Sequence, residues 1–256
     1  MEDLTEGPVH ALLGGKLRLR QPTQGLRAGL DAVMLAASVE ARPGETVLDA
    51  GCGPGGVFLC LLARCPGIRI VAVERDPALA SLARENAALN GWADHVEVVE
   101  GDVADPALRA QLPRCDHAVS NPPYWSGGSA PPEKLRAGAT HGGAVGLDRW
   151  TSLLAAAIGR GGWAGLVLPA ARMDDGITAL RRAGLGGVTL MPLWPRAGQA
   201  ARRVLLRARH APRAPATLLP GLVLHAGQGW TEKADAILRG AALPWEPVSA
   251  ELQFGS

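Results

Sequence analysis

Residues 47–56 read VLDAGCGPGG, an apolar run that passes through Asp49 into a cluster of glycines. The run predicts a buried β-strand, and the apolar residues after the glycines predict a helix. Glycine lets the backbone turn sharply and pass close to a ligand with no side chain in between. Gly51, Gly53 and Gly56 match the pattern GxGxxG, which taken alone is weak evidence for any particular ligand. A strand, a glycine turn and a helix in this order are typical of open α/β sheets, which bind ligands at the carboxyl ends of their strands.

Short apolar runs alternate with helical patterns after this turn. Strands are expected over 46–50, 68–73, 96–99, 117–120 and 163–168, and helices over 56–64, 77–90, 106–112, 147–158 and 172–183. This alternation predicts a mostly parallel sheet covered by helices on both faces. Residues 187–193 and 203–208 have no helix between them, so they predict an antiparallel hairpin at the sheet's edge. The predicted fold is therefore α/β and Rossmann-like, with a seven-stranded, mostly parallel sheet.

The rest of the chain predicts few elements. An extended piece at 16–20 and a helix over 30–39 precede the core, and a short helix is expected near 232–238. No shift in composition marks a linker. We therefore expect one domain over residues 1–256, made of an N-terminal segment (1–45), a Rossmann-like core (46–210) and a C-terminal tail (211–256).

Composition excludes several classes of protein. Of the 256 residues, 47% are hydrophobic and 20% are charged, as in an ordinary folded domain. No apolar run reaches the roughly 18 residues of a membrane span, and the N-terminus lacks the pattern of a signal peptide, so we expect a cytoplasmic protein without membrane contact. The four cysteines have neither CxxC spacing nor nearby histidines, so we expect reduced thiols and no metal. They are Cys52, Cys60, Cys65 and Cys115.

Basic residues are unevenly distributed although the net charge is only +2. No acid occurs between Asp175 and Glu232, where eight arginines fall. These are Arg181, Arg182, Arg196, Arg202, Arg203, Arg207, Arg209 and Arg213. Such a stretch predicts a surface for phosphates, with Arg202 and Arg203 as candidate substrate contacts. The alternative is a compositional bias toward arginine, because the chain has only three lysines.

Acidic residues follow three successive predicted strands. Asp49 and Glu74 end the first and second strands, and Asp102 follows the third. Asp49 can hold an ammonium group, Glu74 can accept hydrogen bonds from two ribose hydroxyls, and Asp102 can accept one from an adenine amino group. Together with Gly51 and Gly53, they favour S-adenosylmethionine, which carries all three groups. A nicotinamide cofactor would use Glu74 in the same way, so that acid alone does not discriminate.

The fourth predicted strand leads into Asn121-Pro122-Pro123-Tyr124. An exocyclic amino or carboxamide nitrogen is a poor nucleophile because its lone pair is delocalised. The Asn121 side-chain oxygen and the Pro122 carbonyl can accept from its N–H groups and stabilise the charge that develops on nitrogen. The two prolines restrict the backbone that aims these acceptors, and Tyr124 can stack on a base. The motif predicts methyl transfer to a planar nitrogen, with Asn121 next to the cofactor and Pro123 and Tyr124 next to the substrate.

Residues 13–37, the glycine turn, Glu74, Asp102 and the NPPY motif together resemble the bacterial tRNA1(Val) adenine-37 N6-methyltransferase family, which belongs to the small-domain methyltransferases. The resemblance extends to about residue 209. It implies a class I methyltransferase fold, S-adenosylmethionine as cofactor, and N6-methylation of an adenine in a tRNA anticodon loop. It also implies that residues 13–37 pack over the cofactor site, which makes Arg27 and Asp31 candidate pocket residues. The chain departs from the family after NPPY and again from Ala214, in regions where substrate contacts are expected.

Three alternatives to an RNA methyltransferase remain open. Protein-glutamine N5-methyltransferases share the fold and NPPY, but they typically carry a longer N-terminal helical domain than residues 1–45 provide. A non-catalytic RNA-binding module could keep the fold as a scaffold, although the three acids and Asn121 argue against it. A nicotinamide-dependent oxidoreductase would need a proton-relay pair near the site, and the sequence shows no obvious one.

Overall fold

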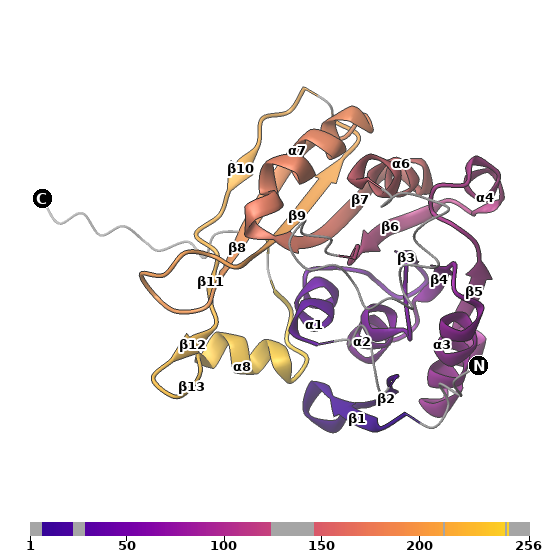
Figure 1. Ribbon diagram of the computed structural model, residues 1–256, viewed down its shortest axis with the longest axis horizontal. Helices are drawn as coiled ribbons and strands as arrows, with labels where there is room; N and C mark the ends of the chain where they lie inside the picture. The colour runs from indigo at the N-terminus through magenta and orange to yellow at the C-terminus, as the bar shows by residue number, and fades with distance from the viewer. Residues whose placement is uncertain (1–6, 23–28, 124–145, 212, 244, 246–256) are drawn as a thin grey trace, which may run out of the picture.

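The computed structural model describes residues 7–22, 29–123, 146–211, 213–243 and 245 (Figure 1). Within these residues lies a nine-stranded mixed sheet in the order β10-β8-β9-β7-β6-β3-β4-β5, with β11 also paired to β8. The long strands are β3 (Thr46–Ala50), β4 (Arg69–Glu74), β5 (Val96–Glu100), β6 (Cys115–Ser120), β7 (Ile158–Pro169), β8 (Gly186–Trp194) and β9 (Arg203–Arg209). The two short strands are β10 (Thr217–Leu218) and β11 (Leu222–Val223).

Strand direction defines one functional edge of the sheet. β3 to β7 pair in parallel, so their carboxyl ends meet at the same edge. β9 runs antiparallel to both β7 and β8, so β8 ends at this edge too. We refer to it as the carboxyl edge.

Helices cover both faces of the sheet, and each face has its own core. They are α1 (Leu30–Ala37), α2 (Gly56–Arg64), α3 (Pro77–Leu89), α4 (Pro106–Gln111), α6 (Leu147–Ala157), α7 (Met173–Arg182) and α8 (Glu232–Leu238), with short 3-10 turns at Leu13–Gly15, Ala93–His95 and Ala170–Arg172. Residues of α1, α2 and α3 share one buried cluster, and residues of α4, α6 and α7 share the other. α2 is buried from Gly56 to Leu62, and each large apolar side chain buried there contributes roughly 1.5–3 kcal/mol. The predicted α/β architecture with two covered faces is confirmed.

Two details of the sheet differ from the sequence expectation. The tail adds β10 and β11 beside β8, so the β8–β9 hairpin is flanked by further strands. These strands have two residues each, too few to show an alternating pattern. β7 begins at Ile158 and not, as predicted, at residue 163. The strand thus includes the glycines that follow Ile158. Position 162 requires glycine, because a Cβ atom there would lie only 2.5 Å from the Asp116 carbonyl oxygen of β6.

The N-terminal hairpin is fastened to α3 by two asparagine side chains. It consists of β1 (Val9–Leu12) and β2 (Leu17–Arg20). Asn86 accepts from the Arg20 N–H at 2.8 Å and donates to its carbonyl at 2.9 Å, and Asn90 does the same to Arg18 at 2.8 and 2.7 Å. Asn86 also donates to the Pro54 carbonyl at 2.8 Å. β2 is therefore held beside α3 and the glycine turn.

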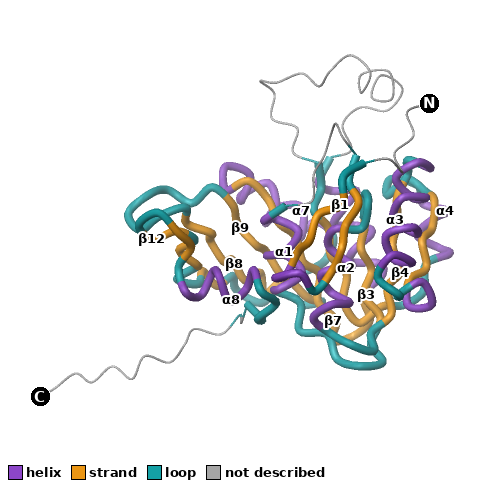
Figure 2. Tube along the Cα trace, turned by 90° about the horizontal axis from the view of Figure 1, so that it is seen from below, coloured by secondary structure: helices purple, strands orange, loops and turns teal. Residues whose placement is uncertain are grey.

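The C-terminal tail forms a small unit at one end of the molecule. It contains β12 (His225–Ala226), β13 (Gly229–Trp230) and α8, which contacts α1. Figure 2 places the β12 hairpin at one end and α3 and α4 at the other. The Leu243 N–H donates to the Ala37 carbonyl at 2.8 Å, which ties this part of the tail to α1. Within the described residues, no helix has both the length and the apolar character of a membrane span.

Candidate active site

The glycine turn between β3 and α2 lies at the carboxyl edge. The N–H groups of Gly51 and Cys52 both donate to the Val73 carbonyl, at 2.8 and 2.9 Å. Gly51 has φ +70°, and a Cβ atom there would lie 2.5 Å from the Trp150 ring of α6. Gly53 has φ +54°, but nothing in the described part of the chain lies within 4 Å of the position its Cβ would take. The turn therefore packs tightly at Gly51 and leaves room for a ligand at Gly53.

Asp49 is the buried acid of this site, with 1% of its surface exposed. The Phe58 N–H donates to its Oδ2 at 3.2 Å. Its Oδ1 is buried and has no hydrogen-bond partner among the described residues. Burial raises the pKa of Asp49 from 3.8 to about 7, the Phe58 N–H opposes this shift, and the Glu74 carboxylate adds to it. A buried acceptor with no partner is rare in folded proteins, so Oδ1 marks a place for a donor.

Glu74 holds the glycine turn from the end of β4. One oxygen accepts from the Gly53 N–H and the other from the Asp76 N–H, each at 2.9 Å. The residue is 8% exposed. A carboxylate has about four acceptor sites, so Glu74 can accept further hydrogen bonds from a ligand. The sequence predicted a ligand contact here but not this clamp on the turn.

Asp102 lies on the same edge, after β5. Its Oδ1 accepts from the Ala104 N–H at 2.8 Å, and its Oδ2 lies 4.0 Å from an Arg75 nitrogen. Its side chain is 42% exposed, so it can be reached from solvent. The structure thus brings Asp49, Glu74 and Asp102 to the ends of three adjacent strands.

The register between β3 and β6 sets the position of Asn121. Ala50 pairs with Ser120, and the Ser120 hydroxyl donates to the Ala50 carbonyl at 2.8 Å. Asn121 follows this pair directly at the end of β6, the strand next to β3, so it lies at the same edge of the sheet as the glycine turn. Pro122 is buried and Pro123 is half-buried, whereas Tyr124 lies outside the described residues.

The remaining predicted site residues fall in three places. Arg203 Nε donates to Asp31 Oδ2 at 2.9 Å, so a predicted substrate contact and a predicted cofactor contact bind each other. Arg202 is exposed at the start of β9. Arg27 lies outside the described residues.

Trp150 and Asn86 support the site but were missed at the sequence level. Trp150 is 8% exposed and packs against Gly51. Asn86 is 1% exposed and bridges β2 and the glycine turn. In the sequence, Trp150 cannot be told from an ordinary core residue, and the burial of Asn86 becomes visible only in the structure.

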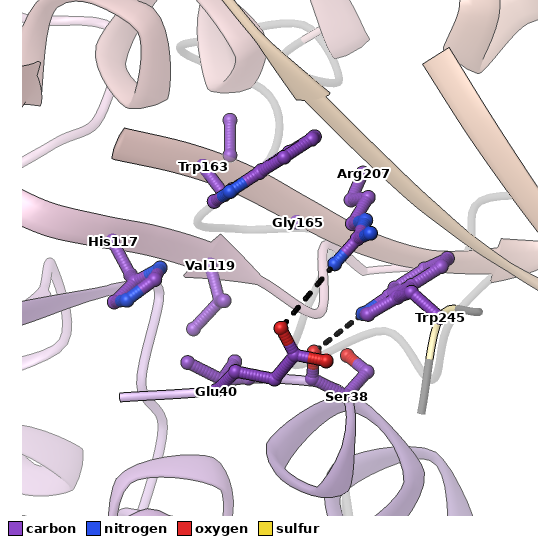
Figure 3. Close-up of a pocket in the computed structure, with 10 residues that line it drawn as sticks. Ser38, Glu40, His117, Val119, Trp163, Gly165, Arg207 and Trp245 are labelled. Atoms are coloured by element: carbon purple, nitrogen blue, oxygen red, sulfur yellow. Dashed lines mark hydrogen bonds and ion pairs between the residues drawn. The ribbon is translucent and has the colours of Figure 1, made fainter. Parts of the chain in front are cut away.

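A separate small pocket, drawn in Figure 3, lies away from the carboxyl edge. Arg207 is stacked there between Trp163, at 4.3 Å, and Trp245, at 4.6 Å. Its guanidinium also lies 3.8 Å from Glu40. Trp245 Nε1 donates to the Ser38 carbonyl at 2.6 Å, so these contacts anchor the tail at Trp245. Arg207 therefore stabilises the tail, although it belongs to the arginine stretch.

Comparisons with known proteins identify the family of this chain. The model of the methyltransferase small-domain family matches residues 28–136. A tRNA1(Val) (adenine(37)-N6)-methyltransferase of Aeromonas hydrophila is 37% identical over 71% of this chain and 76% of its own length. That of Shewanella amazonensis is 33% identical over 71% of this chain and 77% of its own length. The chain belongs to the tRNA1(Val) (adenine(37)-N6)-methyltransferase family. It is an S-adenosylmethionine-dependent methyltransferase, as the sequence predicted.

Solved structures confirm the class I methyltransferase fold. The crystal structure of a predicted O-methyltransferase from Agrobacterium tumefaciens superposes with a TM-score of 0.70. It is 26% identical, and the match covers 83% of this chain and 98% of that one. The geranyl diphosphate C-methyltransferase of Streptomyces coelicolor, solved with S-adenosyl-L-homocysteine, gives a TM-score of 0.52 at 17% identity, covering 70% of this chain and 78% of that one. The second likeness shows the fold alone.

Proposed function

We propose that this methyltransferase transfers a methyl group to N6 of an adenine in a tRNA anticodon loop, as the names of its relatives indicate for position 37 of tRNA1(Val). One observation carries the proposal. The pairing of Ala50 with Ser120 supports it, because Asn121 and the glycine turn then follow neighbouring strands at the same edge of the sheet. We infer that Asn121 and Pro122 provide an acceptor pair for an amino group next to the cofactor site.

The residues at the carboxyl edge fit S-adenosylmethionine. The buried Oδ1 of Asp49 suits the ammonium of the methionine part, because a cation relieves the cost of ionising a buried acid. The open space at Gly53 lets the backbone approach the ligand closely. We propose that Glu74 accepts hydrogen bonds from the ribose hydroxyls and Asp102 from the adenine amino group. When bound, S-adenosylmethionine supplies an electrophilic methyl group.

The chain's own contribution to the reaction is to orient and polarise the substrate nitrogen. The Asn121 side-chain oxygen and the Pro122 carbonyl accept hydrogen bonds from the N6 amino group and favour positive charge on nitrogen. The rigid Pro122-Pro123 backbone keeps these acceptors in place. Positioning nitrogen and methyl carbon in line at roughly 3–3.5 Å provides most of the remaining acceleration. Tyr124 is proposed to stack on the target base.

The proposed partner is tRNA, reached in the cytoplasm, where tRNA is used in translation. Exposed Arg202 lies at the carboxyl edge and is proposed to contact phosphates. Within the described residues, no group of three or more metal-ligating side chains is present. The proposed reaction needs none, because positioning and hydrogen bonding are sufficient for methyl transfer from a sulfonium.

Methyl transfer to defined RNA tests the proposal. The purified protein is incubated with labelled S-adenosylmethionine and unmodified tRNA1(Val) transcript, and the nucleosides are analysed by mass spectrometry. We expect N6-methyladenosine at position 37 and none in a transcript with guanine there. Transfer to a protein glutamine instead, with no methylation of RNA, would establish the competing glutamine activity.

A further inference from the structure

A second surface on the carboxyl edge lies beyond the cofactor site and shares only Arg202 with the residues assigned above. β11 runs parallel to β8 with Val223 opposite Trp194, so the chain leaves β11 at the carboxyl edge. It then forms the β12–β13 hairpin, and residues 195–202 form the loop between β8 and β9 at the same edge. Arg196 Nη1 donates to the Gly227 carbonyl at 2.6 Å, which joins the loop to the hairpin.

The hairpin presents an aromatic pair to solvent. The rings of His225 and Trp230 stack with centroids 4.2 Å apart and planes at 27°. Trp230 is nevertheless 41% exposed, although burying a ring of this size is favourable. The stack holds the indole in one orientation while much of it stays accessible. An exposed, immobilised tryptophan is typical of a surface that binds a planar group.

The charges around the pair favour a polyanion. Arg196 and Arg202 are both exposed in the adjoining loop. The sequence between Asp175 and Glu232 contains no acid, so neither loop nor hairpin carries a negative side chain. Asp235 on the following helix is paired with Arg239 at 2.7 Å. The exposed Glu232 begins the next helix, but the loop and the hairpin themselves carry arginines and no acid, and such a surface suits a phosphate backbone better than a protein face of mixed charge.

We propose that Trp230, His225, Arg196 and Arg202 form a second RNA-binding surface, on which an unpaired base stacks on Trp230 while the arginines contact phosphates. The proposal rests on the proposed function, because the substrate RNA must already reach this edge. Four strand spacings of about 4.8 Å, from β6 through β7, β9 and β8 to β11, put the hairpin roughly 19 Å from Asn121. The stacked base is therefore several nucleotides away from the target base.

The affinity for RNA tests this surface. Binding of fluorescein-labelled, unmodified tRNA1(Val) to the full-length protein is measured by anisotropy with S-adenosyl-L-homocysteine present. Trp230→Ala is expected to weaken RNA binding about tenfold, because stacking on one aromatic ring is worth this order of affinity. Trp230→Phe keeps an aromatic face and should retain most of the affinity. Arg202→Gln should lower the slope of log affinity against log salt by about one.

Leu218→Ala is the matched control. Leu218 is a large apolar side chain of the same tail and is 67% exposed, but it pairs with Leu190 in the middle of β8. This variant should bind RNA like the unsubstituted protein, and all variants should keep their Tm and their affinity for S-adenosyl-L-homocysteine. Unchanged RNA affinity in a folded Trp230→Ala variant would overturn the proposal. The Trp230 ring would then be assigned to contact with a protein partner. If the unsubstituted protein methylates no RNA, the proposed function fails; if it does, and Trp230→Ala binds RNA equally well, only this surface is refuted.

Discussion

Arg203 Nε donates a hydrogen bond to Asp31 Oδ2 at 2.9 Å, although 172 residues separate the two along the chain. The pair joins the first residue of β9 to the first turn of α1. Both side chains are largely shielded, with 35% and 19% of their surfaces exposed. The resemblance assigned Asp31 to the cofactor pocket and the arginine stretch assigned Arg203 to the substrate. Their contact makes the position of α1 depend on the strand that follows the exposed 195–202 loop.

Asp31→Ala and Arg203→Ala should each lower the free energy of unfolding by about 1 kcal/mol, because each breaks a charge-assisted hydrogen bond that is partly screened by solvent. The double variant should lose less stability than the two single variants together. A double-mutant cycle of unfolding free energies measures this difference directly. Asp31→Ala should also weaken cofactor binding more than Arg203→Ala does. Asp175→Ala provides the control, since its contact with Arg172 is exposed and should contribute no more than about 0.5 kcal/mol. Additive losses in the cycle would show that the pair contributes nothing.

Asn121→Ala should reduce the rate of methyl transfer at least about a hundredfold, because it removes one acceptor for the substrate amino group. Affinity for S-adenosylmethionine should change by no more than a few-fold, and calorimetry together with single-turnover kinetics separates the two effects. Asp49→Ala is the counterpart and should weaken cofactor binding first. If Asn121→Ala lost cofactor binding instead, the asparagine would be shown to support the fold of the site.

Cofactor binding should depend on pH through Asp49. Burial raises its pKa to about 7, so in the free enzyme the carboxyl is protonated below that value and cannot pair with an ammonium. Affinity for S-adenosylmethionine should therefore fall as the pH drops from 8 to 6. Asp49→Asn should be weaker throughout and show less of this dependence. A pH-independent affinity in the unsubstituted protein would contradict the assignment.

The raised pKa of Asp49 gives the stability of the ligand-free protein the opposite pH dependence: stability should fall as the pH rises. Between pH 3.8 and about 7, the folded state keeps a proton on Asp49 that the unfolded chain releases. The contribution of this group to the free energy of unfolding is therefore largest below pH 3.8 and is lost as the pH rises through 7. Denaturation of the ligand-free protein at several pH values, compared with Asp49→Asn, isolates this contribution. Equal pH profiles for the two proteins would refute it.

Gly53→Ala should separate folding from cofactor binding. Gly53 has φ +54° and Gly44 has φ +89°, and a Cβ atom at either would meet nothing among the described residues. Alanine at either position should cost about 1 kcal/mol of stability, because left-handed backbone is strained for residues with a Cβ. Only Gly53→Ala should also weaken S-adenosylmethionine binding, by about tenfold or more, which corresponds to some 1.4 kcal/mol. Equal cofactor affinity in both variants would exclude close approach of the ligand at Gly53.

The sequence predicted the core because its signals are local. Each parallel strand is a short apolar run, and Asp49, Glu74 and Asn121 stand at strand ends, where the topology alone brings them to one edge. Contacts between distant segments left no such signal. The pairing of Asp31 with Arg203, and of Asn86 with β2, depends on packing that no short pattern encodes. β10 and β11 have two residues each, too few for a periodic pattern, and Gly162 concealed the start of β7 because glycine is expected in loops.

A crystal structure with bound S-adenosyl-L-homocysteine tests most directly whether the glycine turn and the Asn121-Pro122 segment form one site. We predict the amino group of the ligand at Asp49 Oδ1, its ribose hydroxyls at Glu74, and its sulfur facing the Asn121 side chain. A ligand bound elsewhere, or an Asn121 side chain directed away from the sulfur, would contradict the account.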